Sequence, residues 1–170
     1  EQQARVAMEQ RDVAEKQARR ADAVVNYLSN DLIQSITPTG KGFEQNPTIK
    51  ELVEYASTNL DASFEDDAET RTSLHAAIAA TLSALSEPER SAEHYKKAWR
   101  GYALEFGKDD ELTLITQYDW ARELVNANKF DEALSILDDA DRLAGARIKG
   151  QNKLSMLSAW SRGTYYQKQY

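Results

Sequence analysis

The fold is decided by residues 121–140, which read ARELVNANKFDEALSILDDA. Small side chains recur along this stretch, and larger apolar side chains stand between them. A small residue lets a second helix cross closely, and a large one fills the space beside the crossing. The alternation therefore predicts two antiparallel helices joined by a short turn. The residues that form the pattern are Ala121, Leu124, Asn128, Phe130, Ala133, Leu137 and Ala140.

The same pattern recurs at a fixed distance along the chain. Ala79 and Ala121 are 42 residues apart, and a second step of 42 residues ends at Gly163. We expect these three positions to be close helix crossings. A fixed period of this order is typical of stacked helix pairs. Further matches at this offset are Leu82 with Leu124 and Tyr166, Ser86 with Asn128, Tyr95 with Leu137, and Ala98 with Ala140.

The pattern resembles the tetratricopeptide repeat, whose signature of small and large residues runs across a helix hairpin. The first unit matches less well, because Pro88 and Ser91 replace the usual aromatic residue and alanine. The period is similar to the longer repeats of the kinesin-light-chain type. The resemblance implies an all-α superhelix of helix pairs over residues 48–170, with a half unit, two whole units and a last unit truncated after its first helix. An ordinary helical bundle is the alternative.

The composition favours helices and excludes several classes of function. Hydrophobic residues make up 41% of the chain and charged residues 29%, whereas Gly (7) and Pro (3) are few. The net charge is −7, and an acidic surface repels phosphate backbones, so we expect no nucleic-acid partner. The absence of cysteine excludes disulfides and thiol catalysis. No run approaches the ~20 apolar residues that span a bilayer, so we expect any membrane segment to lie upstream of Glu1.

Residues 1–36 are expected to form one long N-terminal helix, because residues 2–36 contain neither Pro nor Gly and carry a heptad pattern. Residues 37–47 are expected to form a linker, because Pro38 disfavours the helical conformation at Thr37. The long helix is a stalk whose last turns pack on the domain, or it pairs with a second copy in a homodimer. Its apolar positions are Ala4, Ala7, Ala14, Ala18, Ala21, Val25, Leu28 and Leu32.

Beyond the linker the sequence predicts helices and short connections only. Pro47 suits the first turn of a helix, and it is followed by Thr48. The expected helices cover about residues 48–64, 68–85, 88–106, 109–127, 130–144 and 150–170.

No group of residues predicts catalysis, a cofactor or a metal ion. His75 and His94 lack a ligand-type neighbour at helical spacing, so we expect both at the surface or in a groove. Residues 39–42 lack the first glycine, and the Ser or Thr after Lys, of a phosphate-binding loop. The acidic residues 65–67 lack the alternating ligands of a calcium loop, so we expect a solvated turn before a helix. We therefore expect no enzyme activity.

The first helix of each pair should line the concave wall of the superhelix, where a partner protein or peptide would bind. Tyr, Trp and Arg dominate binding hot spots, and an Asn amide can pair with a peptide main chain. The predicted groove residues are Tyr118, Arg122, Asn126, Trp160 and Thr164. The alternative is that Tyr118 and Trp160 only pack between helix pairs. The other predicted wall residues are Ser73, Ala76, Ala80, Ser83, Val125, Leu157 and Lys168.

The order of segments resembles a layout of bacterial single-pass membrane signalling proteins. The resemblance rests on residues 20–28 (RADAVVNYL), residues 35–38 (SITP), a linker, one helix near residues 49–64 and the repeats. In these proteins a cytoplasmic effector precedes a membrane helix, a charged helix and extracytoplasmic repeats. The resemblance implies the periplasmic part of a membrane-anchored transcriptional regulator of the CadC or ToxR type. The alternatives are a transmembrane serine/threonine kinase and a cytoplasmic, soluble scaffold.

Overall fold

Every secondary-structure element in the described part of the chain is an α-helix, as predicted from the sequence. The computed structural model describes residues 48–145 and 153–169. Contacts divide the chain into two units, Glu1–Asn59 and Leu60–Tyr170. The predicted stalk (residues 1–36) and linker (residues 37–47) lie outside the described residues.

Helix α3 (Ile49–Ser63) begins at a capping box formed by Thr48 and Glu51. A carboxylate oxygen of Glu51 accepts hydrogen bonds from the Thr48 amide at 2.7 Å and from its hydroxyl at 2.8 Å. In return the amide of Glu51 donates to Thr48 Oγ1 at 3.3 Å. This reciprocal arrangement satisfies amides that have no partner within the helix.

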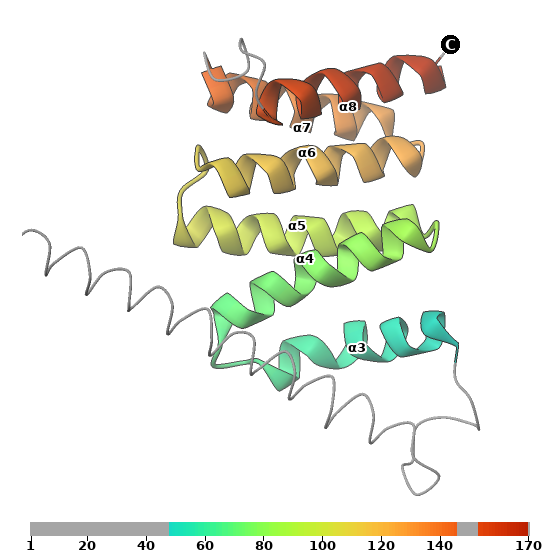
Figure 1. Cartoon of the computed structure of the whole chain (residues 1–170), viewed down its shortest axis with the longest axis vertical. Helices are drawn as coiled ribbons and strands as arrows, with labels where there is room; N and C mark the ends of the chain where they lie inside the picture. Colours follow the sequence, from blue (N-terminus) through green and yellow to red (C-terminus); the bar gives the residue numbers. More distant parts are fainter. Residues whose placement is uncertain (1–47, 146–152, 170) are drawn as a thin grey trace, which may run out of the picture. The chain divides into compact units, whose positions relative to one another are not determined.

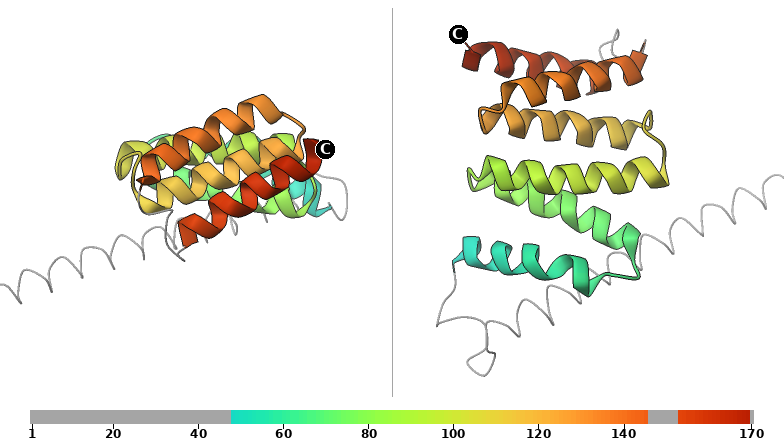
Figure 2. Two further views of the ribbon diagram at one scale, coloured as in Figure 1. Left: turned by 90° about the horizontal axis from the view of Figure 1, so that it is seen from above. Right: turned by 180° about the vertical axis from the view of Figure 1, so that it is seen from behind.

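Five helices make up the described part of the second unit after α3. Each lies within about three residues of a predicted range, because apolar spacing and turn residues are local signals. Helix α4 packs on α5, α5 on α6, α6 on both α7 and α8, and α7 on α8 (Figures 1 and 2). The helices are α4 (Ala68–Ala84), α5 (Pro88–Glu105), α6 (Glu111–Asn126), α7 (Phe130–Ala144) and α8 (Lys153–Gln169).

Two of these helices begin at an aspartate that caps the first turn. The side chain of Asp67 accepts a hydrogen bond from the Thr70 amide at 2.9 Å at the start of α4. Asp110 accepts from the Leu112 amide at 2.8 Å at the start of α6. The acidic turn before α4 therefore caps a helix, as expected for a carboxylate at the positive end of a helix dipole.

The α4–α5 and α6–α7 joints have the same backbone structure. Ser86 has φ 59° and Asn128 has φ 60°, and they are the only non-glycine residues with positive φ in the described part of the chain. This left-handed conformation after a helix is typical of a Schellman C-cap. The next amide in each joint donates to the carbonyl five residues earlier, as Glu87 N to Leu82 O (2.9 Å) and Lys129 N to Leu124 O (2.8 Å).

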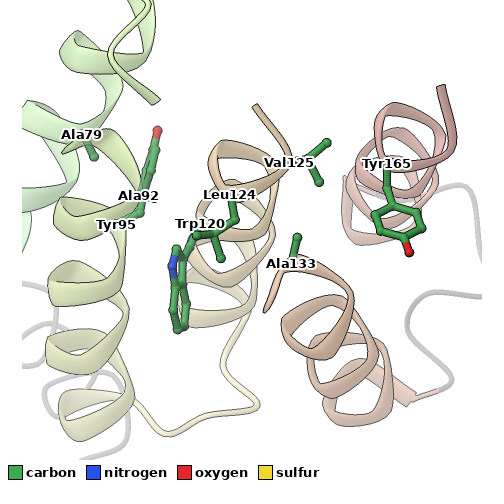
Figure 3. Packing of buried hydrophobic residues seen from close by; sticks show 8 residues of the cluster. All are labelled: Ala79, Ala92, Tyr95, Trp120, Leu124, Val125, Ala133 and Tyr165. Atoms are coloured by element: carbon green, nitrogen blue, oxygen red, sulfur yellow. The ribbon is translucent and has the colours of Figure 1, made fainter. Parts of the chain in front are cut away.

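Most of the residues that recur at 42-residue spacing within α4–α7 lie in the core between these helices. Ser91 takes the place of Ala133 in the first pair, and its buried hydroxyl donates to the carbonyl of Ala79 at 2.8 Å. Figure 3 shows one apolar cluster that joins side chains from α4, α5, α6, α7 and α8. The recurring residues with no more than 2% of their surface exposed are Ala79, Leu82, Ala98, Ala121, Leu124, Leu137 and Ala140.

One of the three predicted helix crossings is wrong. Ala79 and Ala121 are fully buried, but a Cβ atom added at Gly163 would meet nothing within 4 Å. The close approach at a glycine occurs instead at Gly101 in α5, where an added Cβ would lie 2.0 Å from Thr72 Oγ1 of α4. Gly163 fails the prediction because no described helix packs against that side of α8.

Candidate functional site

The structure places Tyr118, the first predicted groove residue, in the core. Its side chain is fully buried, and its hydroxyl donates to Asp141 Oδ1 of α7 at 2.7 Å. The ring belongs to the same apolar cluster as Leu137 and Ala140. Helix α7 thus covers Tyr118, so its prediction as a partner-contacting residue is wrong. Val125, another predicted wall residue, is also fully buried.

Arg122 and Trp160 lie together and connect α6 with α8. The guanidinium carbon of Arg122 is 5.1 Å from the centroid of the Trp160 ring, a cation–π distance. Arg122 also forms ion pairs with Asp119 and, at 2.9 Å, with Glu123. Burial favours the neutral form of Arg122, but the two carboxylates outweigh this effect and raise its pKa. The Arg122 side chain is therefore held in place as a cation beneath an indole ring that is 56% exposed.

A polar pocket of about 400 Å³ lies between the end of α4, the joint that leads into α5, and the C-terminal half of α6. Glu123 is only 1% exposed, and its carboxylate accepts a hydrogen bond from Ser83 Oγ at 2.9 Å. Asn126, the third predicted groove residue, lines the pocket. The complete lining is Ser83, Ser86, Pro88, Glu123 and Asn126.

We call the five pocket residues together with Arg122 and Trp160 the inner-wall site. Thr164, the fifth predicted groove residue, lies one turn beyond Trp160 and donates its hydroxyl to the Trp160 carbonyl at 3.0 Å. The pocket presents hydroxyl, amide and carboxylate groups, which match the amides of a peptide main chain. The exposed indole offers apolar contact area beside them. The site is thus equipped for binding a polar, extended ligand.

Sequence reasoning missed Glu123, Ser86 and Pro88 as members of the site. Glu123 had a weak signal, because it is a carboxylate directly before the apolar residues Leu124 and Val125. A charged residue at such a position is paired when it is buried. Its partner Ser83 lies 40 residues earlier on another helix, so the sequence does not reveal the pair.

The expectation that both histidines lie at the surface or in a groove is wrong. His75 is 4% exposed and His94 is 7% exposed, and their Nδ1 atoms are 3.0 Å apart. His75 Nε2 is 2.9 Å from Asp61 Oδ1, and Lys97 Nζ is 2.7 Å from Asp61 Oδ2. These four residues, which we call the histidine network, link the end of α3 with α4 and α5. Each side chain has a partner on another helix. The sequence prediction considered only neighbours three or four residues away on the same helix, so it could not reveal these partners.

The histidine network disfavours protonation. Burial, together with the neighbouring His75, Lys97 and Arg90, lowers the pKa of His94 from 6.5 to about 4. Burial also lowers the pKa of His75, although Asp61 opposes this effect. Two neutral imidazoles share the short Nδ1–Nδ1 contact by one donating and the other accepting. The pair therefore acts as a neutral hydrogen-bonded connection between α4 and α5.

In residues 48–145 and 153–169, no group of three or more His, Asp or Glu side chains is arranged to hold a metal ion. No described helix is both long and apolar enough to cross a membrane. Comparison with known proteins finds no matching family model, no matching curated protein and no matching solved structure.

Proposed function

We propose that this chain is a non-catalytic protein-interaction domain of the tetratricopeptide type that binds a peptide at the inner-wall site. In this proposal α4–α5 and α6–α7 are whole repeat units, α8 is the first helix of the next, and α4, α6 and α8 line a concave wall. Such stacked pairs present an extended surface that a peptide can follow.

The observation that carries the repeat assignment is the recurrence of one joint after 42 residues. Ser86 and Asn128 share their backbone conformation, and the residues before them, Leu85 and Ala127, have φ and ψ of −84° and 4° and of −82° and 4°. Matching small residues in both pairs are buried at the crossings. An ordinary helical bundle has no reason to repeat a joint in this detail, so the recurrence supports a repeat architecture.

The chemistry of the inner-wall site supports a peptide as the ligand. The amide of Asn126 can donate to and accept from one peptide unit of an extended chain. The Glu123 carboxylate is already compensated by Arg122 and Ser83, so it can remain buried while it lines the pocket. Trp160 supplies the aromatic contact area that dominates many interfaces.

Affinity capture from an extract of the source organism tests this proposal. Wild-type protein is compared with Asn126→Ala, which removes the pocket amide, and with Ser135→Ala, a matched control at an exposed position of α7. We expect Ser135→Ala to retain the specific partners and Asn126→Ala to lose them, with both variants folded by circular dichroism. Equal retention by both variants would show that another surface is responsible.

As the wider role, we propose the periplasmic part of a membrane-anchored bacterial transcriptional regulator. This role is supported by residues 20–28 and 35–38 and by the order of segments, which resemble those of bacterial single-pass membrane signalling proteins. The residues encoded directly before Glu1 test it, because ~20 consecutive apolar residues there would supply the membrane helix. A soluble domain at that place would instead support a cytoplasmic scaffold.

A further inference from the structure

The carboxylate of Glu123 uses only one of its two oxygens within the described part of the chain. Oε1 accepts from Ser83 Oγ at 2.9 Å and from Arg122 Nε at 3.0 Å, and Arg122 Nη2 lies 2.9 Å from the same oxygen. No described residue donates to Oε2, and this atom is not sealed from solvent, so it is open to the pocket that Glu123 lines. Because the side chain is only 1% exposed, Oε2 favours a ligand that donates a hydrogen bond to it.

Two groups of the pocket can only accept hydrogen bonds from a ligand. The Glu123 carboxylate forms an ion pair with Arg122 and carries no proton to donate. Ser83 has a single hydroxyl proton, which it gives to Glu123 Oε1, so that only its lone pairs remain for a ligand. Ser86 adds an exposed hydroxyl to the same lining. A group that enters this pocket must therefore be a donor.

The charge around the pocket favours a cation. The Arg122 guanidinium forms ion pairs with two carboxylates, those of Asp119 and Glu123. These three side chains together carry one net negative charge. The chain as a whole has a net charge of −7, which acts in the same direction. A positively charged donor is therefore attracted to the pocket, and an anion is repelled from it.

We propose that this pocket holds the side-chain ammonium of a lysine in the bound peptide, an inference that rests on the proposed function. An ammonium group has three N–H donors, which Glu123 Oε2 and the hydroxyls of Ser83 and Ser86 can accept. Pro88 gives the pocket an apolar wall for the methylene stem of the lysine. The stem is needed because the carboxylate is almost completely buried, and an α-ammonium at the end of a peptide main chain reaches less deeply.

A guanidinium or a divalent metal ion fits the pocket less well. A guanidinium pairs best with both oxygens of a carboxylate, but Glu123 Oε1 already binds Ser83 and Arg122. Calcium takes about six to eight oxygen ligands, which usually include several carboxylates. The lining of this pocket contains one carboxylate. A lysine ammonium, which needs a single carboxylate oxygen and neighbouring hydroxyls, is the better match.

Three blocked tripeptides test this choice of ligand without a change in the protein. They are acetyl-Ala-Lys-Ala-amide and its versions with norleucine, which lacks the ammonium, and with arginine. Binding to the full chain is followed by two-dimensional ¹H–¹⁵N NMR, with the side-chain amide of Asn126 in the pocket as the reporter. We expect saturable binding of the lysine peptide. The norleucine and arginine peptides should bind at least about tenfold more weakly, because they lose a charge-assisted hydrogen bond or the geometry that it needs.

A pair of matched variants tests the role of Glu123. Glu123→Gln removes the charge, and its carbonyl oxygen can still accept from Ser83 and Arg122 while its amide replaces Oε2 with a donor. Glu132→Gln makes the same change at an exposed position of α7. Circular dichroism checks that both variants are folded. We expect Glu123→Gln to bind the lysine peptide at least about tenfold more weakly and Glu132→Gln to bind it as wild type does.

Each other outcome would overturn the lysine assignment. Equal binding of the lysine and norleucine peptides at Asn126 would do so and would leave a peptide site in place. Tighter binding of alanine amide, which has only an α-ammonium, would assign the pocket to a peptide N-terminus. Equal weakening by Glu123→Gln and Glu132→Gln would indicate a general charge effect. The absence of saturable binding up to about 10 mM would also overturn the assignment, whereas the capture experiment with Asn126→Ala decides the proposed function separately.

Discussion

Ser86 and Asn128 lie 42 residues apart and adopt the same left-handed backbone conformation, with φ of 59° and 60°. Each follows the C-terminal end of a helix, and the residue after each makes the same hydrogen bond back into that helix. The two joints therefore share the same local backbone conformation. This recurrence does not depend on side-chain similarity, because serine and asparagine share little beyond small size and polarity.

The left-handed conformation predicts the effect of glycine at this position. Ser86→Gly should stabilise the protein by about 0.5–1 kcal/mol, because glycine reaches positive φ without the steric cost that a Cβ adds. Ser86→Val should destabilise it by at least as much, because a β-branched side chain fits this region poorly. Urea unfolding followed by circular dichroism measures both. A loss of stability in Ser86→Gly would contradict the assigned joint.

Two helical glycines should respond in opposite ways to alanine. Gly101→Ala should destabilise the protein by about 1–3 kcal/mol, because the new Cβ would overlap Thr72, whose hydroxyl is held by the Ala68 carbonyl. Gly163→Ala should stabilise it by up to about 1 kcal/mol, because its Cβ meets open space and alanine is the better helix former. The thermal unfolding midpoints of the two variants and of wild type, measured by circular dichroism, test the close packing of α4 on α5. Equal shifts would mean that α4 and α5 do not approach as closely as described.

The histidine network predicts a loss of stability in mild acid. The folded pKa of His94 is about 4, below its unfolded value near 6.5, so the unfolded chain takes up a proton first. The stability that the neutral pair provides should therefore be complete above pH 6.5 and fall by up to about 3 kcal/mol as the pH drops towards 4. Urea unfolding at a series of pH values measures this slope.

A variant isolates the contribution of His94 to that slope. The chain has only two histidines, and ordinary carboxyl groups titrate mainly below this window. His94→Gln keeps a hydrogen-bonding side chain beside His75 and should flatten the curve between pH 6.5 and 4.5. Parallel curves for wild type and variant would show that another group produces the acid sensitivity.

Tyr118 should affect stability and not binding. Tyr118→Phe removes the hydroxyl that donates to Asp141 and should cost about 1–2 kcal/mol, because hydrogen bonds to charged acceptors are stronger than neutral ones. Arg162 still bonds to Asp141, with its Nε at 2.8 Å, so that carboxylate keeps a partner. Peptide affinity should be unchanged. Weaker binding at unaltered stability would show that Tyr118 contacts the ligand after all.

The helices and their crossing residues could be predicted because their signals are local or periodic. Apolar spacing, helix breakers and the 42-residue offset gave helix ranges close to those observed, and Ala79 and Ala121 are buried as expected. Ser91 shows how a mismatch can be accommodated, since its hydroxyl bonds to the Ala79 carbonyl. Predicting these features does not require knowing which side chains of different helices contact each other.

The predictions failed where contacts between residues that are distant in the sequence determine whether a side chain is buried. His75 and Asp61 are 14 residues apart, and His75 and His94 are 19 residues apart, so their network is invisible at helical spacing. Tyr118 was predicted on the concave wall, but a helix that carries Asp141 covers it. At Gly163 the repeat phase predicts a crossing, but no described helix packs there. In each case the missing information is which neighbouring helix covers the position.

The most direct test of the central claim is the affinity of a selected peptide for the inner-wall site. A random peptide library is selected on the immobilised wild-type chain, and the dissociation constant of the tightest peptide is measured by fluorescence anisotropy for wild type, Asn126→Ala and Ser135→Ala. We expect about tenfold weaker binding by Asn126→Ala, because the pocket amide is lost, and no change for Ser135→Ala. Equal affinities for all three proteins, or no peptide selected at all, would contradict it.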